Sequence, residues 1–298
     1  MRIDRILAEK RPVFSFEFFP PKTDEGMANL RKTLDELRQD KPDFVSVTYG
    51  ALGTTRERTV EITRFIKQDL GIEAMAHLTC VGASKEELRA VLDQIRDAGI
   101  ENVLALRGDP PEGETEWKPH PGGLKYSTEL ARLISEHYDF AIGGAAFPEV
   151  HPESPDLAHD LRFLKQKLES GVSFLITQLF FDNDLYFDFV EQARAAGIDV
   201  PIVPGIMPIT NFAQIKRITS LCGATIPPQL EAELAARAED PEAVAELGVA
   251  YATLQCADLL ARGAPGIHFY TLNKSPATRA ILAALRAARP WDRVPEPV

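Results

Sequence analysis

The sequence predicts a single (β/α)8 (TIM) barrel, an α/β fold, from its alternation of elements and their number. Eight short segments rich in β-branched and aromatic residues alternate with eight main segments of helical periodicity. Strands that are each followed by a helix form parallel sheets, and a count of eight favours a closed barrel. An open doubly wound sheet is the structural alternative. No Gly-x-Gly-x-x-Gly follows any predicted strand, so a Rossmann dinucleotide site is not supported.

The predicted first strand covers residues 13–19 and stops at two prolines, which cannot extend a sheet. Alternation places Ser15, Glu17 and Phe19 on one face and three phenylalanines on the other. Glu17 is then a carboxyl group near the C-terminal end of an apolar strand, where an unpaired carboxylate tends to keep its proton. A structural pairing of Glu17 with Arg or Lys is equally compatible with this strand.

The other predicted elements follow in order. Further strands are expected over residues 44–49, 73–79, 102–107, 141–147, 174–181, 201–206 and 266–271. Main helices are expected over residues 25–39, 59–70, 84–99, 127–136, 155–170, 185–196, 211–221 and 276–288. Ser84 and Glu87 form a capping box, and Gly99 ends that helix. An extra helical stretch (228–237) and a long helix (242–262) precede the last strand.

Composition limits the class of protein. The net charge of −11 argues against nucleic acid or an anionic membrane as the main partner. Three cysteines without a CxxC or metal spacing fit a reducing cytoplasm. The start has no long apolar region, and no stretch approaches about 18 uncharged apolar residues. We therefore expect a cytoplasmic protein with one domain over residues 1–290 and a Pro-rich tail over residues 291–298.

Polar residues gather at the predicted C-terminal strand ends, where a barrel builds its active site. These ends carry Glu17, Thr48, Tyr49, His77, Thr79, Arg107, Gly108, Asp109, Phe147, Glu149, Thr177, Gln178, Gly205, Thr271 and Asn273. Each has a structural alternative: Arg107 could pair with Asp109, and His77 could be a satisfied core histidine. Convergence of eight polar ends on one rim favours a functional site.

Two loops add detail. The connection over residues 110–125 is long for a βα loop and is either a lid or a surface insert. Residues 147–153 hold a histidine and two carboxylates among prolines, but no spacing points to a third ligand, so we expect no metal. Lys167 is placed to meet a phosphate or to lie on a solvated helix face.

Seven motifs, taken together and in order, resemble the methylenetetrahydrofolate reductase family. They lie at residues 16–21, 46–50, 77–79, 106–109, 148–153, 176–178 and 268–273, and the likeness extends over residues 11–288. The resemblance implies a flavin-dependent (β/α)8 barrel that binds FAD without a Rossmann motif. It also implies two half-reactions at one site, in which NAD(P)H reduces FAD and 5,10-methylenetetrahydrofolate then becomes 5-methyltetrahydrofolate, a methyl supply for methionine synthesis.

The resemblance assigns roles to individual residues. Glu17 matches the general acid that opens the folate ring, Asp109 matches an acidic residue beside flavin and pterin, and Gln178 matches a residue that bonds folate and nicotinamide in turn. Positions matching FAD contacts are Thr48, Tyr49, Ala51, His77, Arg107, Gly108, Asp109, Tyr126, Ser127, Phe147, His151, Asp160 and Lys167. Gln178, Gln214 and Lys274 match substrate contacts, and family habit favours a homo-oligomer.

Five positions depart from the family pattern. Phe147 replaces a Tyr of the relatives, Phe163 and Gln166 replace polar or basic residues, and Ile218 replaces a stacking ring of some relatives. Lys274 replaces Arg, so a point charge stands in place of a bidentate guanidinium. Two other functions fit the residues: a flavin-free lyase that uses Glu17 and His77, and a non-catalytic pterin-binding barrel. The choice between NADH and NADPH and the number of subunits are left open.

Overall fold

The computed structural model describes residues 1–49, 56–109 and 118–293. Contacts along the chain divide it into two compact units. The first unit comprises Met1–Lys10, Ser15–Ala145 and Gln166–Leu175, and the second unit comprises Arg11–Phe14, Ala146–Lys165 and Ile176–Val298. Each unit is described below by itself.

Nine strands form one sheet in the order β7-β6-β5-β4-β3-β2-β1-β9-β8. β7 (Ile202–Val203) and β8 (Gly205–Ile206) are the two halves of one predicted strand. Pro204 separates them because it lacks the N–H that a ladder requires. The strand order therefore begins with β7 and ends with β8, which belong to the same segment of the chain, as in a closed (β/α)8 barrel. The predicted fold class is confirmed.

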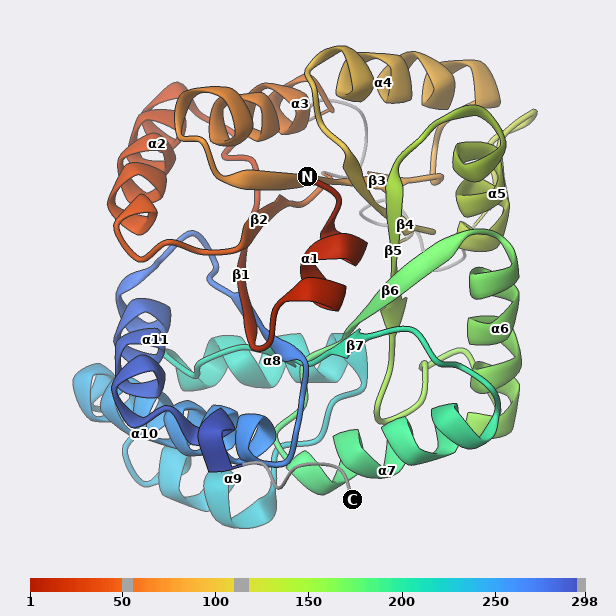
Figure 1. Cartoon of the computed structure of the whole chain (residues 1–298). Coiled ribbons are helices and arrows are strands. Elements are labelled where there is room, and N and C mark those ends of the chain that lie inside the picture. Colours follow the sequence, from red (N-terminus) through yellow and green to blue (C-terminus); the bar gives the residue numbers. More distant parts are fainter. Residues whose placement is uncertain (50–55, 110–117, 294–298) are drawn as a thin grey trace. The chain divides into compact units, whose positions relative to one another are not determined.

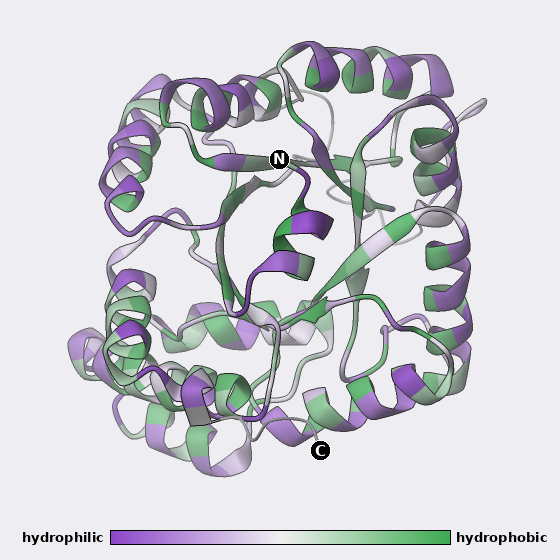
Figure 2. Cartoon of the chain, in the orientation of Figure 1, coloured by the Kyte–Doolittle hydropathy of each residue, from purple (hydrophilic) through white to green (hydrophobic). Residues whose placement is uncertain are grey.

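The first unit is built on parallel strands flanked by helices (Figure 1). Its strands are β2 (Phe44–Val47), β3 (Glu73–Thr79), β4 (Asn102–Leu106) and most of β1 (Val13–Phe18), β5 (Ala141–Ala146) and β6 (Val172–Thr177). Its helices are α1 (Ile3–Glu9), α2 (Asp24–Arg38), α3 (Arg56–Arg64), the π-helix η1 (Phe65–Asp69), α4 (Lys85–Asp97) and α5 (Ser127–His137). Figure 2 shows mainly hydrophobic strands here, and helices that alternate hydrophilic with hydrophobic positions, as a buried sheet and amphipathic helices require.

The second unit carries the remaining elements. They are most of α6 (Leu157–Glu169), α7 (Asn183–Ala195), β7, β8, α8 (Phe212–Cys222), α9 (Pro228–Ala235), α10 (Pro241–Ala261), β9 (Gly266–Tyr270), α11 (Pro276–Ala288) and the 3-10 helix η2 (Pro290–Arg293). The two helices predicted before the last strand are thus α9 and α10. α11 has the predicted boundaries.

Three elements differ from the prediction. α1 was not predicted, because it has only seven residues and no side-chain cap at Arg2. Tertiary contact holds it instead: the Ile3 N–H donates to Asn102 Oδ1 at 2.7 Å, at the start of β4. The helix expected at 59–70 begins earlier and ends as the π-helix η1. β6 ends at Thr177, four residues before the predicted end at Phe181.

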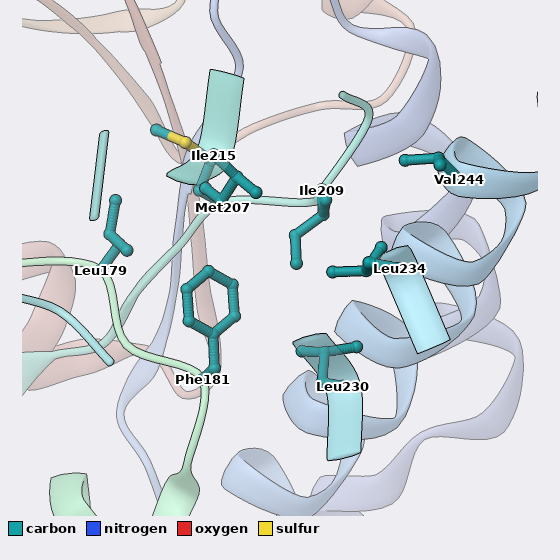
Figure 3. Close-up of a cluster of buried hydrophobic side chains, with 8 residues drawn as sticks. All are labelled: Leu179, Phe181, Met207, Ile209, Ile215, Leu230, Leu234 and Val244. Atoms are coloured by element: carbon teal, nitrogen blue, oxygen red, sulfur yellow. The ribbon is translucent and has the colours of Figure 1, made fainter. Parts of the chain in front are cut away.

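The residues beyond β6 leave the sheet because they join a hydrophobic cluster of the second unit. Figure 3 shows this cluster, in which side chains from α8, α9, α10 and two loops meet. Its buried members are Leu179, Phe181, Met207, Ile209, Ile215, Leu230, Leu234 and Val244. Burying one such side chain contributes about 1.5–3 kcal/mol, which stabilises these residues outside the strand.

α10 has the length and apolar composition of a membrane-spanning helix, and no other helix in the described ranges does. In the second unit it packs against α11, η2 and α7. A Cβ on its Gly248 would lie 1.7 Å from the Ile209 carbonyl oxygen, so the helix and that backbone are in direct contact. Composition alone is weak evidence for a membrane span, because a packed core helix has the same character.

Candidate active site

Glu17 and His77 form the central pair of the first unit. Glu17 lies near the end of β1 with its side chain 17% exposed, and His77 lies on β3 with its side chain 5% exposed. Glu17 Oε2 is 3.4 Å from His77 Nε2. A carboxyl and an imidazole held this close on rigid strands can hold and exchange a proton. The predicted grouping of these two residues is therefore found in the structure.

The predicted cofactor contacts of the first unit lie at strand ends and at one helix start. The Thr48 N–H donates to the Phe18 carbonyl at 2.8 Å, and the Thr48 carbonyl accepts the Thr59 hydroxyl of α3 at 3.0 Å. Tyr126 is exposed directly before α5, and Ser127 begins that helix. Ala51 lies outside the described residues.

The turn after β4 depends on glycine. The Arg107 carbonyl accepts the Val81 N–H at 3.0 Å, which pins the chain just before Gly108. Gly108 has φ +90°, and a Cβ there would lie 2.5 Å from Val81 Cγ1. Both the backbone angle and the lack of space require glycine. Asp109 follows this turn and is exposed.

The first-unit residues fit a dinucleotide such as FAD. Hydroxyls of Thr48, Ser127 and Tyr126 and the guanidinium of Arg107 are donors of the kind that phosphate and ribose groups accept. The glycine at 108 lets the turn that carries Arg107 pack directly against Thr79 and Val81. Lys167 Nζ donates to the Ala145 carbonyl at 2.7 Å, at the end of β5, so its ammonium is held beside this rim.

Gln178 lines a hollow of the second unit. This hollow is lined by Phe147, Pro148, Glu149, Val150, Gln178, Leu179, Cys222 and Ala224. The Gln178 N–H donates to the Ala146 carbonyl at 2.7 Å, and its side-chain Oε1 accepts the Leu179 N–H at 2.9 Å. These bonds fix the amide, so its Nε2 group is the end that can donate to a ligand.

Glu149 closes one wall of this hollow. Both its carboxylate oxygens accept the Thr225 N–H, at 3.1 and 3.0 Å, which ties the loop after β5 to the loop after α8. The next residue, Val150, has φ +69°, a rare angle for a β-branched side chain. Glu149 was among the strand-end residues selected from the sequence, whereas no sequence signal singled out Cys222.

His151 and Asp160 are brought together in the second unit. Asp160 is buried, and its carboxylate accepts the His151 N–H at 3.0 Å and the Ser154 hydroxyl at 3.2 Å. His151 Nδ1 accepts the Glu153 N–H at 3.1 Å, which places the ring proton of neutral His151 on Nε2. Phe147 packs edge-on against His151, with ring centroids 4.6 Å apart. Asp160 thus orders the loop that presents His151.

The predicted substrate contacts Gln214 and Lys274 are both exposed. The Gln214 N–H donates to Asn211 Oδ1 at 2.8 Å, at the N-cap of α8. Lys274 follows two residues in the left-handed region, Leu272 (φ +50°) and Asn273 (φ +60°). The described residues bring no three His, Cys, Asp or Glu side chains together as a metal site requires.

The three cysteines are free thiols. Burial raises the pKa of the Cys80 thiol to about 12, and burial also raises the pKa of Cys222. Cys256 is fully buried in α10, and its pKa is raised as well. None of them has the lowered pKa of a nucleophilic cysteine.

Comparison with known proteins gives consistent matches. A family model described as methylenetetrahydrofolate reductase matches residues 2–286. A probable methylenetetrahydrofolate reductase (NADH) of Oryza sativa subsp. japonica is 39% identical over 295 residues, covering 95% of this chain and 50% of the relative. The 5,10-methylenetetrahydrofolate reductase of Escherichia coli K12 is 41% identical over 271 residues, covering 91% of this chain and 90% of the relative. The chain spans about half the length of the plant relatives it matches.

A solved structure supports the fold alone. An uncharacterized protein from Clostridium thermocellum, which binds two copies of 5-methyl-5,6,7,8-tetrahydrofolic acid, has a TM-score of 0.66 and 17% identity. The match covers 97% of this chain and all of that one. The family model and the bacterial relative cover nearly the whole chain. The chain therefore belongs to the methylenetetrahydrofolate reductase family.

Proposed function

We propose that this protein reduces 5,10-methylenetetrahydrofolate to 5-methyltetrahydrofolate with NAD(P)H and bound FAD. The observation that carries the proposal is the Glu17 carboxyl, which lies 3.4 Å from His77 at a strand end, in a chain of this family. Reduction of this folate requires an acid that protonates it and opens its five-membered ring to a reactive iminium. A largely buried carboxyl on an apolar strand suits that task.

Other residues would bind and orient the reactants. Gln178 would donate its amide Nε2 group to folate and to nicotinamide in turn, because its Oε1 is already held by Leu179. Exposed Asp109 would favour the cationic form of the folate by its negative charge. Gln214 and Lys274 would contact substrate, with the Lys274 ammonium attracting an anionic group. Phe147 and Cys222 would form the apolar part of the wall around Gln178.

FAD would supply hydride transfer between the two substrates, which gives ping-pong kinetics at one site. Thr48, Tyr49, Ala51, His77, Arg107, Gly108, Asp109, Tyr126, Ser127, Phe147, His151, Asp160 and Lys167 would hold it. The plant relatives are named as NADH enzymes, and NADH is the donor we propose to test first. We further propose a cytoplasmic homo-oligomer whose product serves methionine synthesis.

A spectroscopic titration tests this proposal. The visible spectrum of the purified protein is recorded, NADH is added without oxygen, and methylenetetrahydrofolate follows; a colourless preparation is first incubated with FAD. Loss of the yellow absorbance with NADH and its return with the folate would support both half-reactions. A parallel titration with NADPH ranks the two donors.

The two alternatives give different spectra. A flavin-free lyase would be colourless, would not take up FAD and would be indifferent to NADH. A non-catalytic folate-binding barrel would bind the folate without any return of colour. Either result would overturn the reductase proposal.

A further inference from the structure

Ser46 lies beneath the Glu17–His77 pair in the first unit. The order of strands places β2 between β1 and β3. Ser46 of β2 is in register with Glu17 of β1 on one side and with Met75 of β3 on the other. Because in-register residues of parallel strands point to the same face, the Ser46 hydroxyl shares the face of Glu17 and His77. The contact from Glu17 to His77 therefore crosses over β2 at the level of Ser46.

The Ser46 hydroxyl is an exception among buried polar groups. The residue is fully buried, and within the described part of the chain its Oγ makes no hydrogen bond. Buried polar side chains are nearly always bonded, and an exception indicates a strained or functional position. Burying a hydroxyl without a hydrogen bond costs about 1–3 kcal/mol, so such a position favours a hydroxyl that gains a partner in another state of the site.

Of the two residues in register with Ser46, one is a strong hydrogen-bond partner. Met75 presents a thioether, which is a weak acceptor. Glu17 presents a carboxyl from a backbone position about 4.8 Å away, the spacing of adjacent strands. A carboxyl oxygen accepts an O–H donor in either protonation state, because one oxygen of the acid remains unprotonated. Rotation of the Glu17 side chain is enough to bring its carboxyl to Ser46.

We propose that Ser46 is a positioning residue for Glu17. When Glu17 faces the folate, the Ser46 hydroxyl donates to one carboxyl oxygen and leaves the other, which carries the proton, directed at the substrate. After the proton is transferred, the same O–H stabilises the carboxylate that remains. Ser46 neither gains nor loses a proton. This inference rests on the proposed role of Glu17 and names the residue that orients it.

The test is Ser46→Ala in the FAD-loaded protein, with each half-reaction followed separately. We expect the folate half-reaction to slow about tenfold, the effect of one lost hydrogen bond to a charged group. Flavin reduction by NADH should keep the parental rate, because Glu17 has no part in it. The melting temperature should not fall, since the hydroxyl has no partner in the resting structure. Ser46→Thr, which restores a hydroxyl, should recover most of the folate rate.

Ser170→Ala is the control, because Ser170 is also buried and its hydroxyl donates to the Gln166 carbonyl, just before the start of β6. It should leave both half-reactions at the parental rate. A parental folate rate in Ser46→Ala would overturn the inference, as would an equal loss of both half-reactions together with a lower melting temperature. If the parental protein itself fails to reduce the folate, the proposed function falls and this inference falls with it. If the parental protein reacts and Ser46→Ala is unaffected, only the role of Ser46 is wrong.

Discussion

The first unit carries its candidate acid on a strand, whereas the second unit carries its candidate site on loops. Glu17 is held by the ladder of β1 with β2, and its contact His77 lies on β3. Gln178 follows the end of β6, and its hollow is closed by Glu149 bonding to Thr225, 76 residues away in the chain. A strand position is set by a repeating backbone ladder, whereas a loop position depends on individual tertiary bonds.

Backbone strain separates the two sites in the same way. Val150, Leu272 and Asn273, which all follow strand ends in the second unit, have positive φ without being glycine. Such residues cost about 1–3 kcal/mol each and persist only where neighbouring contacts hold them. At the first-unit site, the positive φ after β4 falls on Gly108, for which it is not strained. In the second unit, tertiary contacts therefore hold these loop residues in backbone angles that their side chains disfavour.

The largest effect should come from the acid of the first unit. Glu17→Gln keeps the shape of the side chain but removes its transferable proton. We expect the folate half-reaction to fall by about 10²–10⁴-fold, the usual contribution of a general acid, while NADH still reduces the flavin. Anaerobic stopped-flow absorbance measures each half-reaction. Glu61→Gln is the control, because this carboxylate, 43% exposed, pairs with Arg31 on the described surface. Equal folate rates in the two variants would rule out the role of Glu17.

The next effect should come from close packing in the second unit. Gly248→Ala would place a Cβ 1.7 Å from the Ile209 carbonyl oxygen, so helix α10 would have to move. We expect a loss of about 3 kcal/mol in the free energy of unfolding, the upper end for overpacking. In the first unit, Gly99→Ala meets nothing within 4 Å and carries only the cost of φ +74°, about 1–2 kcal/mol. Urea unfolding measures the free energy of unfolding of both variants. A smaller decrease for Gly248→Ala than for Gly99→Ala would contradict the close contact between α10 and Ile209.

A smaller effect tests the strained loop. Val150→Gly removes a β-branched side chain from φ +69°, a backbone angle that glycine adopts freely. We expect the free energy of unfolding to rise by about 1 kcal/mol, reduced in part by the greater entropy of glycine in the unfolded chain. Chemical denaturation measures the change. A clear decrease in stability would mean that side-chain contacts of Val150 outweigh its backbone strain.

The smallest effect concerns the thiols. Because burial raises the pKa of Cys80 from 9.0 to about 12, the folded state holds this proton more tightly than the unfolded chain. The resulting stabilisation is complete below pH 9.0 and is lost as the pH rises toward 12. With iodoacetamide at about pH 8, we expect labelling at partly exposed Cys222 and none at buried Cys80 or Cys256. Peptide mass spectrometry before and after unfolding measures the labelling of each cysteine. Rapid labelling of Cys80 in the native protein would contradict its burial.

Strand positions were predictable and loop positions were not. The spacing of apolar residues predicted the exact bounds of β3 and α11, and it placed Glu17 and His77 on strands. It missed α1, which tertiary contact with Asn102 holds in place, and it extended β6 into residues that pack in the hydrophobic cluster instead. Glu149 and Ser46 both lie in the sequence motifs. The structure adds that Glu149 accepts the distant Thr225 N–H and that Ser46 is in register with Glu17.

The sequence by itself determined the fold class, the family and the residue types at the strand ends, because periodicity and motif order are local properties of the chain. The tertiary structure alone decided that Glu17 reaches His77 across β2 and that Ser46, among the described residues, is buried without a partner beneath them. It also decided that Glu149 bonds to the Thr225 N–H, 76 residues away. Distances between side chains depend on register and packing between strands, and neither is encoded in the spacing along one segment.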